Sequence, residues 1–93
     1  MSLTAQQRKS LELLQEELTK RHSELLVESV RMSDQMEDIA YRCFITEELD
    51  YEPAREQYRT LTAGQAQVRA HREEIDDNLA TIARQLRKGG QND

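Results

Sequence analysis

The sequence contains few aromatic residues and no tryptophan, which argues against a compact β-sheet core. Aromatic side chains account for 4% of the 93 residues, whereas charged side chains account for 33%. This composition is typical of long solvated helices and not of a sandwich or barrel. A single domain of this length buries only a modest fraction of its surface, so we expect oligomerisation to contribute to its stability.

Cysteine and long apolar runs are also scarce. The single cysteine, Cys43, excludes an internal disulfide, and the first residues lack the basic segment and apolar run of a secretory signal. The longest uninterrupted aliphatic stretch is Leu25-Leu26-Val27. It is far shorter than the roughly 20 apolar residues that cross a bilayer. We therefore expect a cytoplasmic protein without a membrane-spanning segment.

Basic residues are too few and too dispersed for a nucleic-acid-binding face. The net charge is -5, and phosphate binding requires concentrated positive charge. The acidic excess is local, because residues 47–53 contain four acids and no base. These four residues form the acidic turn, which comprises Glu47, Glu48, Asp50 and Glu52.

Apolar residues recur every seven positions in both halves of the chain. A sustained heptad repeat predicts helix, since a strand would show alternation with a period of two. We call these ten positions the seam: Leu11, Leu18, Leu25, Met32, Ile39, Ala54, Leu61, Val68, Ile75 and Ile82. Polar Gln65 and Arg72 occupy neighbouring seam-facing positions in the second half, where polar residues commonly determine register or oligomeric state. The pattern predicts helices over residues 5–45 and 53–88.

Local signals agree with these boundaries. Thr4 and Gln7 have the spacing of a capping box, and Pro53 is tolerated in the first turn of a helix. Gly89-Gly90 follows a basic pair, as is common just after a helix. We therefore predict a turn over residues 46–52 and a flexible tail over residues 89–93.

The two repeats also predict how the helices pair. Opposing Ile39 with Leu61 and Met32 with Val68 places each pair symmetrically about position 50, inside the acidic turn. Registers shifted by one heptad remain possible, with the turn displaced by about 3.5 residues. The predicted fold is all-α: residues 1–93 form a single domain, an antiparallel two-helix coiled-coil hairpin that dimerises into a four-helix bundle.

The first predicted helix carries more apolar surface than one partner helix can cover. Several large side chains lie outside its seam, and such an excess indicates a second partner. The sequence therefore predicts a non-enzymatic protein-interaction module (an adaptor, an assembly factor or a small chaperone) that also self-associates. We call the predicted partner-binding residues the flank, which comprises Leu13, Leu26, Val27, Val30, Tyr41 and Phe44.

No residue cluster predicts catalysis, a cofactor or a metal ion. His22 and His71 lie about one heptad apart in the proposed register, roughly 10 Å along the helices, and no third ligand is evident. Neither histidine has a catalytic serine, cysteine or carboxylate pair beside it. Cys43 is interpreted as a small apolar residue near the turn. We therefore expect that the protein is not an enzyme.

The acidic turn supports an alternative function. Acidic loops are ordinarily solvated, and carboxylates before a helix N-terminus are favoured by its dipole. The segment Leu49-Asp50-Tyr51-Glu52-Pro53-Ala54-Arg55-Glu56-Gln57 nevertheless resembles the tip of the bacterial transcript-cleavage factors, which insert an antiparallel coiled coil into RNA polymerase. The likeness covers about ten residues, and that family also carries a C-terminal globular domain. It implies a regulator in which Asp50 and Glu52 are the tip acids.

Overall fold

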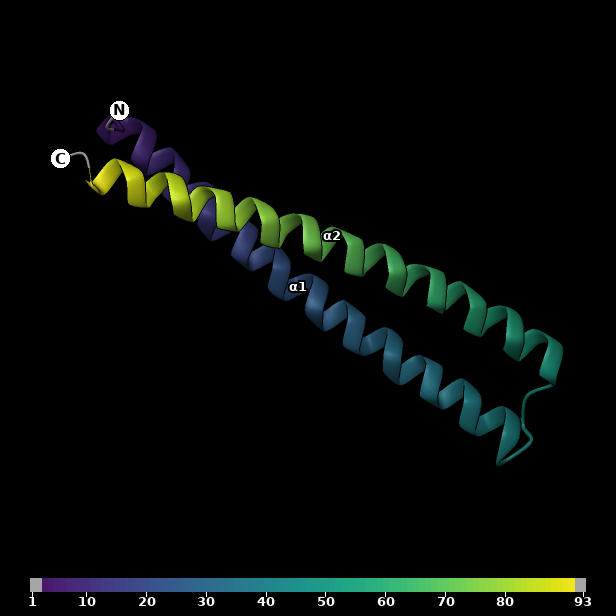
Figure 1. The fold of residues 1–93 in the computed structure, drawn as a ribbon. Helices are drawn as coiled ribbons and strands as arrows, with labels where there is room; N and C mark the ends of the chain where they lie inside the picture. Colours follow the sequence, from purple (N-terminus) through teal and green to yellow (C-terminus); the bar gives the residue numbers. More distant parts are fainter. Residues whose placement is uncertain (1–2, 92–93) are drawn as a thin grey trace. The chain divides into compact units, whose positions relative to one another are not determined.

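Two long helices account for nearly all of the described chain (Figure 1). The computed structural model describes residues 3–91, with side chains over residues 3–88. Helix α1 spans Ala5–Phe44 and helix α2 spans Tyr51–Gln91, and residues 3–91 contain no strand. The prediction of an all-α protein with two long helices is confirmed. Neither helix, within the described residues, offers a stretch that is both long and apolar enough to cross a membrane.

The start of α1 is defined by the predicted capping box. The backbone N–H of Gln7 donates to Thr4 Oγ1 at 3.1 Å, and the backbone N–H of Thr4 donates to Gln7 Oε1 at 2.9 Å. These reciprocal bonds satisfy two backbone donors, one of them a first-turn N–H that has no partner within the helix. The helix therefore begins at Ala5, as predicted.

The other helix boundaries differ from the sequence prediction to varying degrees. Helix α1 ends one residue early, at Phe44, and α2 begins two residues early, at Tyr51. The predicted helix stop at Gly89-Gly90 is wrong, because α2 continues to Gln91. Glycine lowers helix stability by about 1 kcal/mol per residue without forbidding the helical conformation. Residues 92 and 93 of the predicted tail lie outside the described residues.

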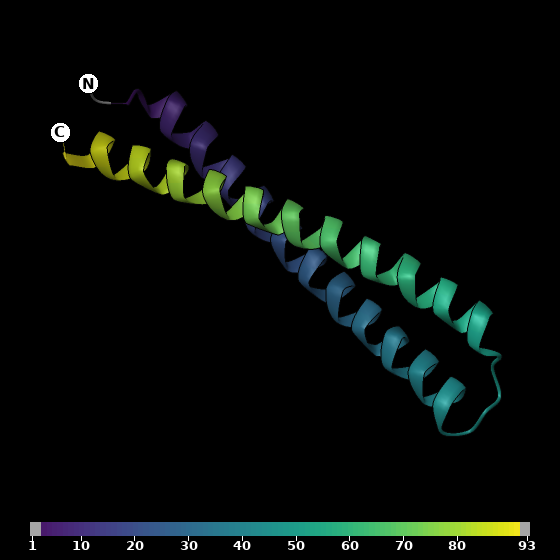
Figure 2. The same cartoon turned by 45° about the vertical axis from the view of Figure 1, so that its right-hand side comes forward.

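The described chain divides into two compact units, each of which combines a segment of α1 with a segment of α2. The first unit contains residues 3–24 and 72–91, and the second contains residues 25–71. Both helices are continuous in sequence through the two units. The second unit contains the reversal between the helices, which both views show (Figure 1, Figure 2).

In the second unit the two helical segments are held in register by one polar and one close apolar contact. Gln65 Nε2 donates to the carbonyl oxygen of Ser29 at 3.2 Å and to Ser33 Oγ at 2.7 Å. Gly64 allows close approach of Met32. If residue 64 had a Cβ atom, that atom would lie 3.3 Å from Met32 Cε. Met32 thus lies beside α2 one turn before Val68, its predicted partner. Gln65 therefore joins α1 and α2 by hydrogen bonds in this register, and polar residues at such positions commonly determine register.

In the first unit the two segments meet through apolar and polar side chains. Ile75 and Ile82 of α2 are buried, and His22 Nε2 of α1 lies 3.1 Å from Asp76 Oδ1. Arg72 Nε is buried without a hydrogen-bond partner. A buried donor without a partner is costly, and in this respect Arg72 differs from Gln65, whose side-chain amide is hydrogen-bonded in the second unit.

Candidate interaction surface

The predicted flank of α1 is exposed, whereas the seam is buried or half-buried. In the second unit, Val27 is 59% exposed and Phe44 is 66% exposed, whereas seam residue Leu25 is 2% exposed. In the first unit, Leu13 is also exposed. Large apolar side chains in water are individually common, whereas extended exposed apolar patches are less common. The remaining flank residues, all exposed, are Leu26, Val30 and Tyr41.

Within the second unit the flank forms two patches and not a continuous stripe. Leu26 and Val30 lie one helical turn apart, with Val27 beside them. Three turns further on, Tyr41 and Phe44 form the second patch. The helical positions between the patches carry charged residues, including Glu37. A partner can therefore cover the first patch without reaching the second.

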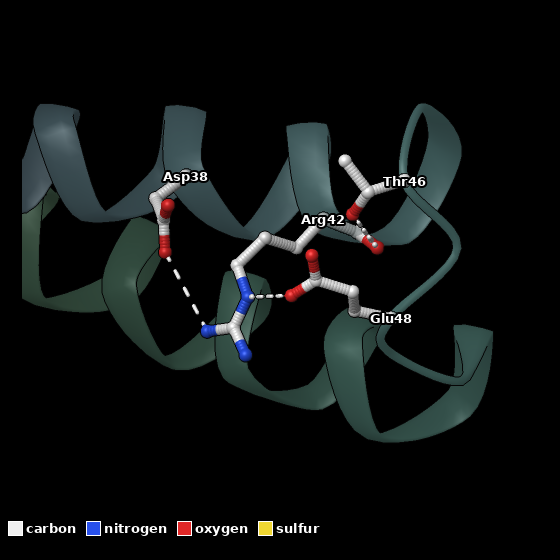
Figure 3. A network of polar contacts seen from close by, with 4 residues as sticks. All are labelled: Asp38, Arg42, Thr46 and Glu48. Carbon is white, nitrogen blue, oxygen red and sulfur yellow. Dashed lines mark hydrogen bonds and ion pairs between the residues drawn. The ribbon is translucent and has the colours of Figure 1, made fainter.

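The acidic turn is organised by Arg42 near the end of α1 (Figure 3). Arg42 Nε donates to Glu48 Oε2 at 3.2 Å, and Arg42 Nη1 lies 3.7 Å from Asp38 Oδ2. The Arg42 carbonyl accepts the N–H groups of Glu48 and Leu49 at 2.8 and 3.2 Å, and the Thr46 hydroxyl at 3.4 Å. One residue thus engages both the backbone and a carboxylate of the turn. Glu48 is held against the end of α1.

The other acids of the turn have separate structural settings. Glu47 has a φ of 56°, the left-handed conformation that often follows a helix. Asp50 immediately precedes α2, and its carbonyl accepts the Ala54 N–H at 3.1 Å. Glu52 lies in the first turn of α2, where the helix dipole favours a carboxylate. Across the described residues, no group of three or more histidine, cysteine, aspartate or glutamate side chains is arranged to hold a metal ion.

Substituting Glu47 with glycine is expected to raise the free energy of unfolding by about 0.5 to 1 kcal/mol, because glycine adopts positive φ without steric cost. Glu47→Ala is the matched control, since it removes the same carboxylate but keeps a Cβ. Urea unfolding followed by circular dichroism measures both variants. An equal gain in the alanine variant would show that charge, and not backbone strain, is the cause.

All four aromatic residues of the chain lie around the turn, a feature that the sequence analysis did not use. They fall within residues 41–58, and each is exposed. The rings of Phe44 and Tyr51 meet edge to face, with centroids 6.2 Å apart and planes at 62°. Because α1 ends with one ring and α2 begins with the other, the reversal brings them together. The concentration of scarce aromatics in one short segment was the available sequence signal.

Three of these aromatic residues, Phe44, Tyr51 and Tyr58, line a groove between the end of α1 and the start of α2 (the turn groove). It has a volume of about 370 Å³ and lies within the second unit. Its wall contains Cys43, which is half-buried and is the only cysteine in the sequence. The remaining lining residues are Ile39, Ala40, Ala54, Arg55 and Arg59.

The lining of the turn groove is mostly apolar and includes two arginine residues. Arg55 and Arg59 lie one helical turn apart on α2 and both line it. Arg59 Nη1 lies 3.7 Å from Glu56 Oε1, whereas Arg55 forms no ion pair with the described side chains. Like charges at this spacing repel each other by roughly 0.2 to 0.5 kcal/mol. An anionic group between the two guanidinium groups would relieve that repulsion.

Comparisons with known proteins provide no family for this chain. No family model, curated protein or solved structure matches it. Function is therefore inferred from exposure, geometry and charge.

Proposed function

We propose that this chain is a non-enzymatic protein-interaction module, an adaptor, assembly factor or small chaperone, that binds a protein partner through the exposed flank of α1. The observation that carries this proposal is the contrast between adjacent residues Leu25, which is buried, and Leu26, which is exposed. Packing within the second unit already uses the seam. The patch formed by Leu26, Val27 and Val30 is left for another surface.

The energy available from this patch favours it over the acidic turn. Burying a leucine or valine side chain contributes roughly 1.5 to 3 kcal/mol, whereas an exposed carboxylate in an ion pair contributes about 0 to 1. Glu48 is moreover already engaged by Arg42. The alternative function, a regulator whose acidic turn enters a large enzyme such as RNA polymerase, therefore depends on Glu47, Asp50 and Glu52.

Affinity capture with the whole chain as bait tests the proposal. The informative bait is Leu26→Asp with Val30→Asp, which places charge in the patch. Its matched control is Gln35→Asp with Gln67→Asp, which adds the same charge at two exposed positions of the same unit. A genuine partner is retained by the wild-type and control baits and lost from the patch variant. Retention by all three baits would contradict binding through this patch.

We also propose that the chain self-associates in the cytoplasm, by packing the flanks of two copies into a four-helix bundle. Sedimentation equilibrium at micromolar concentration is expected to show a dimer, because the Leu26–Val30 patch is otherwise in water. Leu26→Asp with Val30→Asp should shift the chain to monomer, and the Gln35 and Gln67 control should not. A wild-type monomer at high concentration would instead assign the patch to a different partner protein.

A further inference from the structure

We propose that the turn groove is a second binding site, which takes an apolar side chain from an acidic segment of a partner protein, with Arg55 and Arg59 binding the carboxylates beside that side chain. The site is distinct from the Leu26–Val30 patch. It also differs from the acidic-turn hypothesis in the sign of the charge that makes contact. Its validity does not depend on the function proposed above.

The shape of the groove determines the size of its occupant. A volume of about 370 Å³ lies near the lower end of the usual range for ligand sites, about 300 to 1,000 Å³. It therefore suits one or two side chains and not a whole helix. The lining includes the seam residues Ile39 and Ala54, the neighbouring Ala40, and three aromatic residues.

The rim residues are of the types that dominate binding energy at protein interfaces. Tyrosine and arginine are enriched among such residues, and tyrosine presents an apolar ring with a polar hydroxyl. Tyr51 and Tyr58 lie two turns apart on α2 and both line the groove. Phe44 faces them from the end of α1, where its ring packs against Tyr51. An apolar side chain entering here meets aromatic surface from both helices.

The charge of the groove determines the chemistry of its occupant. The described ion pairs of the second unit engage Arg42 and Arg59, and leave Arg55 without a carboxylate. Arginine binds carboxylates through paired hydrogen bonds, which favours an acidic segment over a neutral or basic one. The protein itself carries a net charge of -5, so an acidic partner gains no general attraction from it. Recognition must then come from these local arginines.

Binding is tested on the full chain with synthetic nine-residue peptides, capped at both ends. The main probe has one central phenylalanine among glutamates. A second peptide has serine in place of the phenylalanine, and a third has glutamines in place of the glutamates. We expect saturable binding of the first peptide, with NMR shift changes at the groove and slower alkylation of Cys43 by iodoacetamide. The other two peptides should bind at least fivefold more weakly.

Arginine variants supply the decisive comparison. Arg55→Gln with Arg59→Gln should weaken binding of the main probe about fivefold or more, because both charge pairs with the peptide carboxylates are lost. The matched control is Arg31→Gln with Arg69→Gln, two exposed arginines of the same unit. It makes the same change in net charge and should alter affinity less than twofold. Circular dichroism confirms that both variants remain helical.

Four outcomes would overturn the proposal. Equal weakening by the two arginine pairs would show that only net charge matters. Equal binding of the serine peptide would show that the groove is not used, and no saturable binding of the main probe would show that it is not a site for this chemistry. Finally, the variant with Arg55→Gln and Arg59→Gln could lose self-association while the wild-type chain binds the peptide only as a monomer. This result would show that the groove is occupied by a second copy of this chain. The first three outcomes do not bear on the Leu26–Val30 patch.

Discussion

Replacing Leu25 with alanine is expected to lower the free energy of unfolding by about 2 to 5 kcal/mol, the range for leucine truncation in a packed core. The same replacement at Leu26 is expected to change it by less than about 1 kcal/mol. Leu25 is 2% exposed and Leu26 is 47% exposed. The two variants have the same helix propensity and adjacent positions, so the comparison isolates burial. A chain of this length has a total stability of about 5 to 15 kcal/mol, which makes the first effect large.

Urea unfolding monitored by circular dichroism measures both variants, with the midpoint and slope compared to the wild type. The measurement is repeated at several protein concentrations, because self-association through the flank would add a concentration-dependent loss at Leu26. Similar losses at the two positions in dilute solution would mean that the buried and exposed sides of α1 have been assigned incorrectly.

Leu26→Asp with Val30→Asp is expected to weaken binding of the captured partner by about a hundredfold or more. Two apolar side chains contribute roughly 3 kcal/mol or more when buried, and about 1.4 kcal/mol corresponds to a factor of ten. The comparison variant neutralises the free acids of the turn through Glu47→Gln, Asp50→Asn and Glu52→Gln. It leaves Glu48 in place, since its bond to Arg42 holds the turn.

The variant with a neutralised turn should mainly slow association and reduce its dependence on salt, because unpaired surface charge accelerates encounter more than it stabilises a complex. Surface plasmon resonance at two salt concentrations separates these rates. A partner that loses its response only in the turn variant, and binds the patch variant normally, would favour the regulator with an inserting acidic turn.

Arg42 illustrates a structural role that sequence spacing does not reveal. Its contact with Glu48 spans six residues and depends on the left-handed backbone at Glu47. No repeat or motif specifies that conformation for a glutamate, since glycine is the residue that ordinarily adopts it. The sequence shows four acidic residues in one segment. That Glu48 is bound by Arg42 while the other three acids are not follows from the path of the turn.

The sequence by itself determined the secondary structure, including the start of α1 and the side of each helix that faces inward. Both depend on interactions between residues three to seven positions apart, such as the bonds between Thr4 and Gln7. The predicted helix end at Gly89-Gly90 was wrong, because the weak helix-breaking preference of glycine did not end α2 there. The flank could be listed from the heptad pattern, although its binding role stays a prediction.

Only the tertiary structure decided which distant residues meet. The bonds of Gln65 join it to Ser29 and Ser33, more than thirty positions away, and the heptad repeat by itself does not distinguish this register from one shifted by seven residues. The turn groove likewise exists because the reversal places the end of α1 beside the start of α2. Phe44 and Arg55 are ordinary exposed residues on separate helices. Their shared groove depends on the geometry of the turn, which the heptad pattern does not encode.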